Sequence, residues 1–268
     1  MIFEFSKAIE AALNAGIEIM HIYESEDLRI NTKNDSSPVT QADIAASNII
    51  ETILHSTHIP IICEETTHAP YSIRSSWNKV WIIDPLDGTK DFIERNGEFT
   101  VNIALIEKNI PLFGVIYIPV YDTLYFGGQN YGSYMLTQCS LRIDSFDYEH
   151  IASMSVQLPL TETCNTNIIV ASRSFFDSDT QAYIDSFIAQ HPGSEIKHLG
   201  SSLKFLEVAT GKAYIYPRKS HIHEWDVAAG HAIAEGAGCI FTTIDTHERI
   251  GYNSESLLCP AFILQRKN

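Results

Sequence analysis

The stretch KVWIIDPLDGTKDF, residues 79–92, runs from an apolar segment directly into acidic residues. Its first five residues predict a buried β-strand. Asp84 and Asp87 follow that strand three positions apart. Pro85, which lies between them, and Gly88 are expected to end the strand and to bend the chain. The two carboxylates can then converge on one point at the end of the strand.

The same stretch also indicates a chemistry. Hard divalent cations take oxygen ligands, and Mg²⁺ is held by a few carboxylates together with water and substrate phosphate. Gly88, Thr89 and Lys90 add backbone N–H groups, a hydroxyl and a cation, and a helical turn that begins here would offer its amino end to a phosphate. The alternative is that Asp84 and Asp87 only form a turn and that Thr89 only caps a helix.

Length and composition indicate a globular protein with a substantial core. The chain has 268 residues, of which 45% are hydrophobic and 19% charged, enough for one large domain or two closely packed ones. No apolar run reaches the roughly 18 residues of a membrane span. The amino terminus carries Glu4 in an amphipathic pattern, unlike a signal peptide. We therefore expect a cytoplasmic protein, with peripheral association with the inner membrane and the oligomeric state left open.

Charge and cysteine content exclude several classes of function. A formal net charge of -15 argues against a nucleic-acid polymer or an anionic membrane as partner. An anionic small molecule is compatible with this charge where bound cations reverse the local sign. The cysteines are odd in number, scattered and without a CxxC pair, so we expect reduced thiols; they are Cys63, Cys139, Cys164, Cys239 and Cys259.

The first half of the chain has the pattern of an α+β domain. Two helices are expected, over residues 2–23 and from the Thr40–Asp43 capping-box pattern to about His55. Short strands follow, several of them with turn residues between them, which indicates mainly antiparallel sheet; they are expected at residues 59–63, 79–83, 99–107, 112–118 and 124–126.

The second half alternates strands with helices, which is typical of an α/β domain. Strands are expected at 168–171, near Ile196 and at 213–216, and helices at 178–190, 202–209 and 226–235. The change of pattern predicts a first domain over residues 1–145, with most of the acidic site, and a second over 146–268, with Asp226 and the substrate contacts. No low-complexity linker separates them, so an extensive shared interface is expected.

Three acidic motifs carry a resemblance to a known family. They are ICEE (62–65), WIIDPLDGTKDF (81–92) and EWDVAAGHAI (224–233). Together and in this order they resemble the inositol monophosphatase superfamily. HLGSSLKF (198–205) and YIYPR (214–218) favour its CysQ-type branch of 3'(2'),5'-bisphosphate nucleotidases. The resemblance covers nearly the whole chain and implies a layered αβαβα sandwich of the sugar-phosphatase type, which combines α/β and α+β parts.

The resemblance also implies a set of site residues. Two or three Mg²⁺ ions would be held by Glu64, Asp84, the Leu86 carbonyl, Asp87 and Asp226. Glu64 and Thr89 would orient the attacking water, and Asp43 would hold the Thr89 hydroxyl. Alternatives remain open, because Asp43 also fits a simple helix cap and Asp226 fits an acidic residue that opens a helix. Glu65 fits a group behind the metal ligands or a solvated neighbour.

Further residues bear on the substrate, which we expect to be a small phosphorylated nucleotide. The substrate phosphate would meet Glu64, Leu86, Asp87, Gly88, Thr89 and Asp226. Lys90, Lys204 and Arg218 are candidate cations for a second phosphate, Ser201 and Ser202 candidate hydrogen-bond donors, and Arg173 a candidate neighbour of the base. These residues favour hydrolysis of the 3'-phosphate of adenosine 3',5'-bisphosphate to AMP and phosphate, which would clear a by-product of sulfate assimilation.

Other functions are weighed against this one. An inositol monophosphatase or sugar-bisphosphate phosphatase of the same superfamily is the alternative activity, and a non-catalytic binding protein is a third hypothesis. Haloacid-dehalogenase phosphatases separate their two aspartates by one residue, whereas two residues separate Asp84 from Asp87. A calcium EF-hand fails because Phe92 takes the position of its glycine. His221 and His223 suggest zinc, but no third ligand has suitable spacing.

Overall fold

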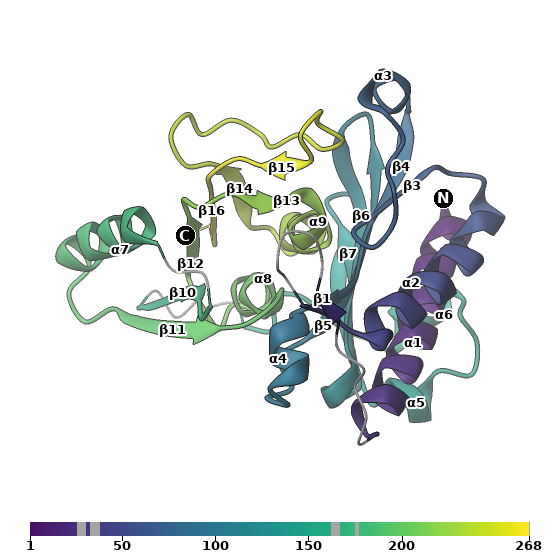
Figure 1. The fold of residues 1–268 in the computed structure, drawn as a ribbon. Coiled ribbons are helices and arrows are strands. Elements are labelled where there is room, and N and C mark those ends of the chain that lie inside the picture. Colours follow the sequence, from purple (N-terminus) through teal and green to yellow (C-terminus); the bar gives the residue numbers. More distant parts are fainter. Residues whose placement is uncertain (26–30, 33–37, 162–166, 175–176, 268) are drawn as a thin grey trace.

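The computed structural model describes residues 1–25, 31–32, 38–161, 167–174 and 177–267. Within these residues the elements form five layers (Figure 1). In order, these are helices α1 (Ile2–Tyr23) and α2 (Gln41–Leu54), a seven-stranded sheet, helices α8 (Leu203–Ala209) and α9 (Ala228–Gly236), a five-stranded sheet, and helix α7 (Ser178–Gln190). This arrangement confirms the predicted layered sandwich.

The seven-stranded sheet is mainly antiparallel, as predicted. Its described strands lie in chain order: β3 (Ile61–Cys63), β4 (Lys79–Asp87), β5 (Thr100–Glu107), β6 (Ile110–Ile118), β7 (Thr123–Gly128), β8 (Gly132–Thr137) and β9 (Val156–Gln157). Only the pair β3–β4 is parallel among these neighbours. Lys108 and Asn109, which join β5 to β6, both have positive φ, 50° and 63°, as a tight hairpin turn requires.

Strand β4 runs further than the sequence predicted. Pro85 does not end it, and the strand continues to Asp87. Its pairing with β5 shifts register between Asp84, opposite Asn102, and Asp87, opposite Thr100. The shift accommodates a proline, which has no N–H to donate to the neighbouring strand. The predicted bend is therefore an irregularity within the strand, and both aspartates remain attached to the sheet.

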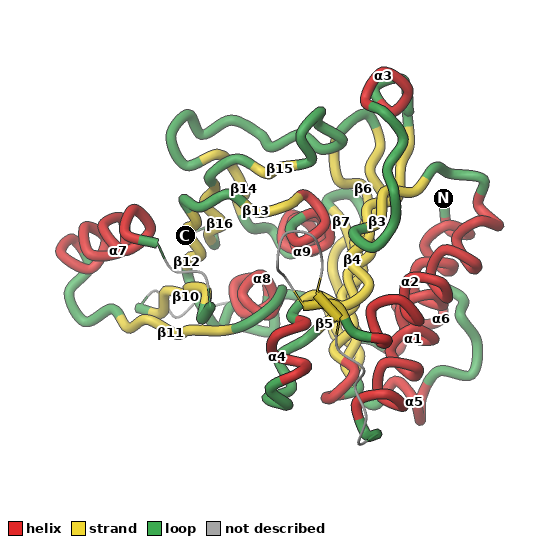
Figure 2. Tube along the Cα trace, in the orientation of Figure 1, coloured by secondary structure: helices red, strands yellow, loops and turns green. Residues whose placement is uncertain are grey.

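The five-stranded sheet lies between α7 and the helices α8 and α9 (Figure 2), and its strands pair both parallel and antiparallel. Its order is β11 (Glu195–Leu199), β10 (Ile168–Ser172), β12 (Ile215–Arg218), β16 (Phe262–Gln265) and β14 (Ile240–Thr243). Strand β10 is parallel to β11 and β12, as the alternating pattern predicted. Strand β16 is antiparallel to β12 and β14. The sequence did not predict strands β14 and β16.

Helix α9 packs closely between the two sheets because small residues face their neighbours. A Cβ on Gly114 of β6 would lie 2.4 Å from the carbonyl oxygen of Ala229, and a Cβ on Gly230 would lie 2.4 Å from the ring of Phe205. Either side chain would force the elements apart. The small residues of α9 therefore fix the distance between the first sheet and α8.

The remaining described elements are short. They are β1 (Asn31–Thr32), β2 (Pro38–Val39), β13 (Ile222–His223), β15 (Leu258–Cys259), α3 (Tyr71–Arg74), α4 (Thr89–Ile93), α5 (Cys139–Arg142), α6 (Tyr148–Met154), η1 (His55–Thr57), η2 (Pro119–Tyr121) and η3 (Glu224–Asp226). Asp226 ends η3 and α9 begins at Ala228, so the prediction that Asp226 opens a helix was wrong.

The chain passes from the first sheet to the second between Gln157 and Ile168. The boundary predicted after residue 145 therefore precedes α6 and β9, and the division into two domains stays a prediction.

Cys63, Cys139, Cys239 and Cys259 are buried free thiols, whereas Cys164 lies outside the described residues. Of the helices described, none has the length and apolarity needed to cross a membrane.

Candidate active site

Three carboxylates from distant parts of the chain meet at the edge of the first sheet. Glu64 directly follows β3, Asp84 lies in β4 and Asp226 ends η3. Because β3 and β4 are parallel, with Cys63 opposite Ile83, Glu64 and Asp84 lie at the same end of neighbouring strands. One carboxylate oxygen from each of the three residues lies within 4.8 Å of the others. We call these residues the carboxylate trio.

The trio concentrates acidic groups around the buried Asp84, while Glu64 and Asp226 are half-buried. Burial, followed by the charges of Glu64 and Asp87, raises the pKa of Asp84 well above its usual range. Burial and then Asp87 do the same to the pKa of Asp226, which Arg218 partly offsets. Several carboxylates that repel one another in this way are suited to a hard divalent cation, whose charge and oxygen preference match them. The trio therefore has the donor set of a metal site.

Leu86 and Asp87 lie next to the trio, but Asp87 is not one of the carboxylates that converge within 4.8 Å, and the role of both residues as metal ligands stays a prediction. The Leu86 N–H donates to Asp84 Oδ1 at 3.1 Å. The Leu86 carbonyl oxygen lies 3.4 Å from Thr89 Oγ1. Asp87 Oδ2 accepts from Ser202 Oγ at 2.8 Å and lies 3.0 Å from Ser201 Oγ. The two serines, predicted as nucleotide contacts, are thus brought to an acidic residue of the site.

Gly88 and Thr89 form a tight turn between β4 and α4. Gly88 has φ +95°, and a Cβ there would lie 2.8 Å from the Glu98 carbonyl oxygen, so glycine is the residue that fits. Thr89 Oγ1 donates to Asp43 Oδ1 at 3.0 Å. Asp43 Oδ2 accepts from both the N–H and the hydroxyl of Thr40 at 2.7 Å. Asp43 therefore takes part in the capping box of α2 and also holds the Thr89 hydroxyl. Both contacts considered for Asp43, the helix cap and the bond to Thr89, are present.

The three predicted cations differ in their surroundings. Lys204 and Arg218 are only 4% and 7% exposed, which is rare for charged side chains. Lys204 Nζ donates to the backbone carbonyls of Leu199 and Ser201. Burial lowers the pKa of Lys204 to about 8, and Asp87 and Asp226 act in the opposite direction. The Arg218 guanidinium lies 3.5 Å from the Tyr216 hydroxyl. Lys90 is 63% exposed and lies 3.8 Å from Glu94.

Arg173 holds a loop that borders the site. It forms ion pairs with Glu98 at 2.7 Å and with Asp91 at 3.6 Å. Glu98 Oε2 also accepts from the Gly200 N–H at 2.6 Å. Arg173 therefore acts on the chain just before Ser201, and its proximity to a base stays a prediction.

The histidines near the site do not form a zinc centre in the described part of the chain. The ring of His223 stacks on that of Trp225, with ring centroids 4.4 Å apart. The backbone N–H of His223 donates to Asp226 Oδ2 at 2.9 Å. Among the described residues, the carboxylate trio is the group whose geometry could hold a metal ion, and neither His221 nor His223 belongs to it. The position of Glu65 relative to the metal ligands stays a prediction.

Sequence reasoning missed two sets of buried polar residues around the site. Asn102 of β5 is 1% exposed and donates to Asp87 Oδ2 at 3.2 Å. Glu224, the first residue of η3, accepts from the Asn253 N–H at 2.6 Å. Arg74 Nη1 donates to Asn253 Oδ1 at 2.7 Å. A polar residue within the apolar run VNIALI (101–106) was the signal available for Asn102.

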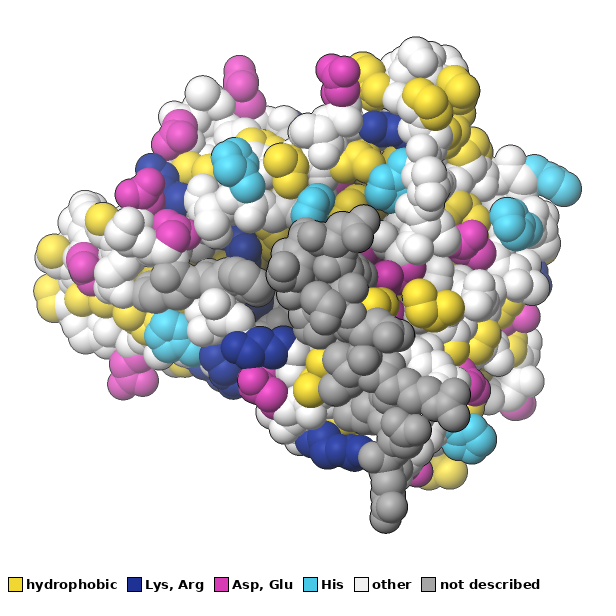
Figure 3. Space-filling model, viewed as in Figure 1, with side chains coloured by type: hydrophobic (Ala, Val, Ile, Leu, Met, Phe, Trp, Pro, Cys, Tyr) yellow, Lys and Arg dark blue, Asp and Glu magenta, His cyan; other side chains and the backbone are white. Residues whose placement is uncertain are grey.

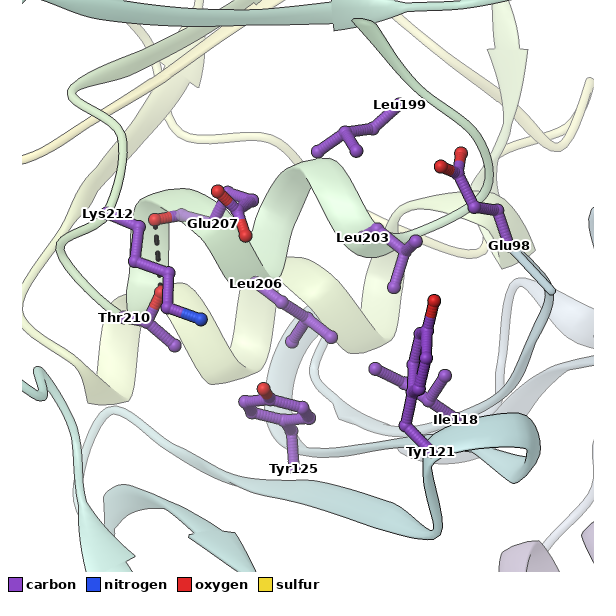
Figure 4. A pocket seen from close by; sticks show the side chains of 10 residues that line it. All are labelled: Glu98, Ile118, Tyr121, Tyr125, Leu199, Leu203, Leu206, Glu207, Thr210 and Lys212. Atoms are coloured by element: carbon purple, nitrogen blue, oxygen red, sulfur yellow. Dashed lines mark hydrogen bonds between the residues drawn. The ribbon is translucent and has the colours of Figure 1, made fainter. Parts of the chain in front are cut away.

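A cavity lies apart from the trio, between α8 and the first sheet (Figure 4). Its volume is about 230 Å³, and its apolar lining comes from Ile118, Tyr121, Tyr125, Leu199, Leu203 and Leu206. Two acids line it as well, Glu98 paired with Arg173 and Glu207 paired with Lys197 at 2.7 Å. Charges of both signs are intermixed over the face drawn in Figure 3.

Comparison with known proteins agrees with this geometry. The profile of the Inositol monophosphatase family matches residues 4–268. The chain is 41% identical, over 85% of its length and 86% of the relative, to the 3'(2'),5'-bisphosphate nucleotidase CysQ of Salmonella typhimurium. It is 39% identical to the same-named protein of Buchnera aphidicola, over 87% of this chain and 81% of that one.

Solved structures show the same likeness. The crystal structure of CysQ from Bacteroides thetaiotaomicron, a bacterial member of the inositol monophosphatase family, matches with a TM-score of 0.89 and 42% identity over 98% of this chain and 96% of that one. Inositol monophosphatase II from Staphylococcus aureus shares the fold, with a TM-score of 0.73 and 22% identity over 97% and 88% of the chains. The protein therefore belongs to the inositol monophosphatase family.

Proposed function

We propose that the protein is a Mg²⁺-dependent 3'(2'),5'-bisphosphate nucleotidase, which hydrolyses the 3'-phosphate of adenosine 3',5'-bisphosphate to AMP and inorganic phosphate. The observation that carries the proposal is the carboxylate trio beside the Thr89–Asp43 pair. This arrangement occurs in a chain that is 39–41% identical to proteins named for that activity. Oxygen ligands next to an oriented hydroxyl suit metal-assisted hydrolysis of a phosphate ester.

The residues that would hold two or three Mg²⁺ ions are Glu64, Asp84, the Leu86 carbonyl, Asp87 and Asp226. The burial of Asp84 and the repulsion between Asp84, Asp226 and their acidic neighbours support this role, because a cation relieves both. When bound, Mg²⁺ supplies positive charge to the phosphate oxygens and makes water more acidic. Mg²⁺ rather than a softer metal fits a ligand set made only of oxygen atoms.

Thr89, Asp43 and Glu64 would direct the attacking water. Asp43 Oδ1 accepts the Thr89 hydroxyl proton, so the lone pairs of Thr89 Oγ1 face away from Asp43 and can accept from water. Glu64, on the neighbouring strand end, adds a second acceptor. Two acceptors fix the direction of a water molecule better than one, and positioning of this kind contributes strongly to catalysis.

The buried cations support a substrate with two phosphates. Lys204 and Arg218 lie in the second half of the chain, and both interact electrostatically with Asp87 and Asp226. Backbone carbonyls solvate the Lys204 ammonium but carry no full charge, so the second phosphate of the nucleotide would add a favourable ionic partner. Four further points stay predictions. They are the phosphate contacts of Gly88 and Thr89, the nucleotide contacts of Lys90, Ser201 and Ser202, the role in sulfate assimilation and the cytoplasmic location.

A substrate panel tests the proposal. Phosphate release would be measured from adenosine 3',5'-bisphosphate, inositol 1-phosphate and fructose 1,6-bisphosphate, each with and without Mg²⁺. We expect the highest kcat/KM for the nucleotide and no turnover in the presence of a chelator. Equal or better turnover of inositol 1-phosphate would assign the site to the alternative activity. An Asp87→Asn enzyme that keeps full turnover would reject the metal mechanism.

A further inference from the structure

Asp87 receives hydrogen bonds from both halves of the molecule. Asn102 Nδ2, on β5 of the first sheet, lies 3.2 Å from Asp87 Oδ2. Ser202 Oγ, in the loop before α8, lies 2.8 Å from the same oxygen. Asn102 Nδ2 also donates to Ser202 Oγ at 2.8 Å, across 100 positions of sequence. These three side chains form a closed triangle of hydrogen bonds, which we call the Asp87 triangle.

The protons of the triangle have one consistent arrangement. Thr100 Oγ1 donates to Asn102 Oδ1 at 2.9 Å, so the amide nitrogen of Asn102 faces Asp87 and Ser202. An Asn102 with the opposite orientation would place its oxygen against a carboxylate oxygen, which is repulsive. Ser202 accepts from Asn102 and gives its one proton to Asp87. Both residues are therefore donors to Oδ2.

Ser201 lies beside the Asp87 triangle, but its hydroxyl proton goes to a residue other than Asp87. Its hydroxyl has one proton and two neighbouring acceptors, Asp87 Oδ2 at 3.0 Å and Thr100 Oγ1 at 2.7 Å. Since Thr100 donates to Asn102, the closer contact makes Ser201 a donor to Thr100. Ser202 and Asn102 are the residues whose geometry commits them to Asp87.

The loop that carries Ser202 is held in place by its neighbours. Gly200 donates its N–H to Glu98, and a Cβ on Gly200 would lie 2.7 Å from the Asp91 carboxylate. Ser201 has φ +47°, a conformation that non-glycine residues keep only where surrounding contacts require it. Ser202 and Asn102 are each 1% exposed. The two donors are therefore shielded from water, while Asp87 is half-buried.

We propose that Asn102 and Ser202 are positioning residues that fix the Asp87 carboxylate by occupying its Oδ2, which would leave Oδ1 available to a bound cation. This inference rests on the metal site of the proposed function. It gives Ser202 a role in cation binding instead of nucleotide binding. Groups that orient metal ligands in this way typically change metal affinity about 10- to 100-fold when they are removed.

Binding of Mn²⁺ to the substrate-free protein tests the inference, because it is independent of turnover. The concentration of free Mn²⁺ would be followed by electron paramagnetic resonance during titration of wild type, Ser202→Ala and Asn102→Leu. We expect each variant to bind Mn²⁺ about 10- to 100-fold more weakly. Ser133→Ala is the matched control: Ser133 is also fully buried, and it donates to the Ile233 carbonyl at 2.7 Å, away from Asp87.

The outcomes separate this inference from the proposed function. Unchanged Mn²⁺ affinity in Ser202→Ala overturns the inference, and so does an equal loss in Ser133→Ala, which would reflect general destabilisation. Should Asn102→Leu fail to fold, Ser202→Ala decides alone. A raised KM for the nucleotide that excess Mg²⁺ does not restore, with normal Mn²⁺ binding, would return Ser202 to the nucleotide. A wild-type protein that binds no Mn²⁺ would reject the metal site itself.

Discussion

Thr89 Oγ1 donates a 3.0 Å hydrogen bond to Asp43 Oδ1, although 46 positions of sequence separate the two residues. The other oxygen of Asp43 caps α2 through Thr40. One side chain thus joins the start of a helix to the turn that follows β4. A substitution that keeps the cap but changes the contact with Thr89 can separate the two roles.

Asp43→Asn is that substitution. The amide oxygen can replace Oδ2 at the cap, while the amide nitrogen, a donor, then faces Thr89 and turns its hydroxyl proton away. We expect kcat to fall about 100-fold or more, KM to change little, and the free energy of unfolding to fall by about 1 kcal/mol or less. Steady-state kinetics and urea unfolding measure the two effects.

Asp177→Asn provides the control for Asp43→Asn. Asp177 caps α7 by accepting from the backbone of Asp179 and Thr180, far from the carboxylate trio in sequence. We expect the same small loss of stability and an unchanged kcat. A normal kcat in Asp43→Asn would instead mean that Asp43 serves only as a helix cap.

Asp84→Asn should stabilise the metal-free protein while it abolishes turnover. Burial and then Glu64 raise the pKa of Asp84, so its charge is unfavourable when no cation is bound. The asparagine oxygen can still accept from the Leu86 N–H. We expect the Tm without metal to rise by about 2–4 °C, equivalent to about 1 kcal/mol. Added Mg²⁺ should raise the Tm of wild type more than that of the variant.

Glu224→Gln is a contrasting control for this charge effect. Glu224 is buried too, but both of its oxygens accept from backbone N–H groups, those of Asn253 and Ser254. Replacing one oxygen with an NH₂ group places a donor against a donor, so we expect the Tm to fall. Calorimetry that showed Asp84→Asn and Glu224→Gln to be equally destabilising would contradict the stored repulsion in the trio.

The buried Lys204 and Arg218 should contribute more to kcat/KM for the nucleotide than the exposed Lys90. Lys204→Met and Arg218→Met each remove a charge that could pair with a second phosphate, and we expect kcat/KM for adenosine 3',5'-bisphosphate to fall about 10- to 100-fold. Lys90→Gln changes an exposed side chain that lies near Glu94, where a smaller effect is expected. Kinetics in which Lys90→Gln has the largest effect would contradict this order.

His231 should make stability depend on pH. It lies in α9, 2.9 Å from the Tyr252 hydroxyl and 3.3 Å from Glu235, and Arg249 pairs with the same glutamate at 2.8 Å. Burial lowers the pKa of His231. The unfolded chain therefore takes up the proton first, so the contribution of His231 to stability is complete above about pH 6.5 and is lost as the pH falls below that value.

The measurement is urea unfolding of wild type and His231→Gln between pH 7.5 and 5. We expect the slope of unfolding free energy against pH to be shallower in the variant below about pH 6.5, by at most about 1.4 kcal/mol per pH unit. His55→Gln, at an exposed histidine, should keep the wild-type slope. Parallel curves for wild type and His231→Gln would show that His231 does not titrate between the two states.

The sequence predicted much of the fold because many of its elements carry local signals. The capping box at Thr40 and Asp43 marks the start of α2, and the two residues after β5 have the conformation of a hairpin turn. Strands β14 and β16 were not predicted, because short strands that pair antiparallel with a distant partner have little local pattern. Pro85 was expected to end β4, but the shift in pairing within the sheet accommodates it.

The sequence predicted the acidic residues of the site better than the contacts that support them. Glu64, Asp84 and Asp226 stand out as acids in motifs, and the structure brings them together. The burial of Lys204 and Arg218, and the bond from Ser202 to Asp87, depend on how the two sheets pack. Such contacts join residues far apart in sequence, and no local pattern encodes them.

Phosphorus NMR of adenosine 3',5'-bisphosphate mixed with the protein, with and without Mg²⁺, tests the proposed reaction most directly. Loss of the 3'-phosphate signal, with matching growth of inorganic phosphate, a retained 5'-phosphate signal and no reaction in the presence of a chelator, is the expected result. Release of the 5'-phosphate, or hydrolysis that proceeds at the same rate without a divalent cation, would contradict it.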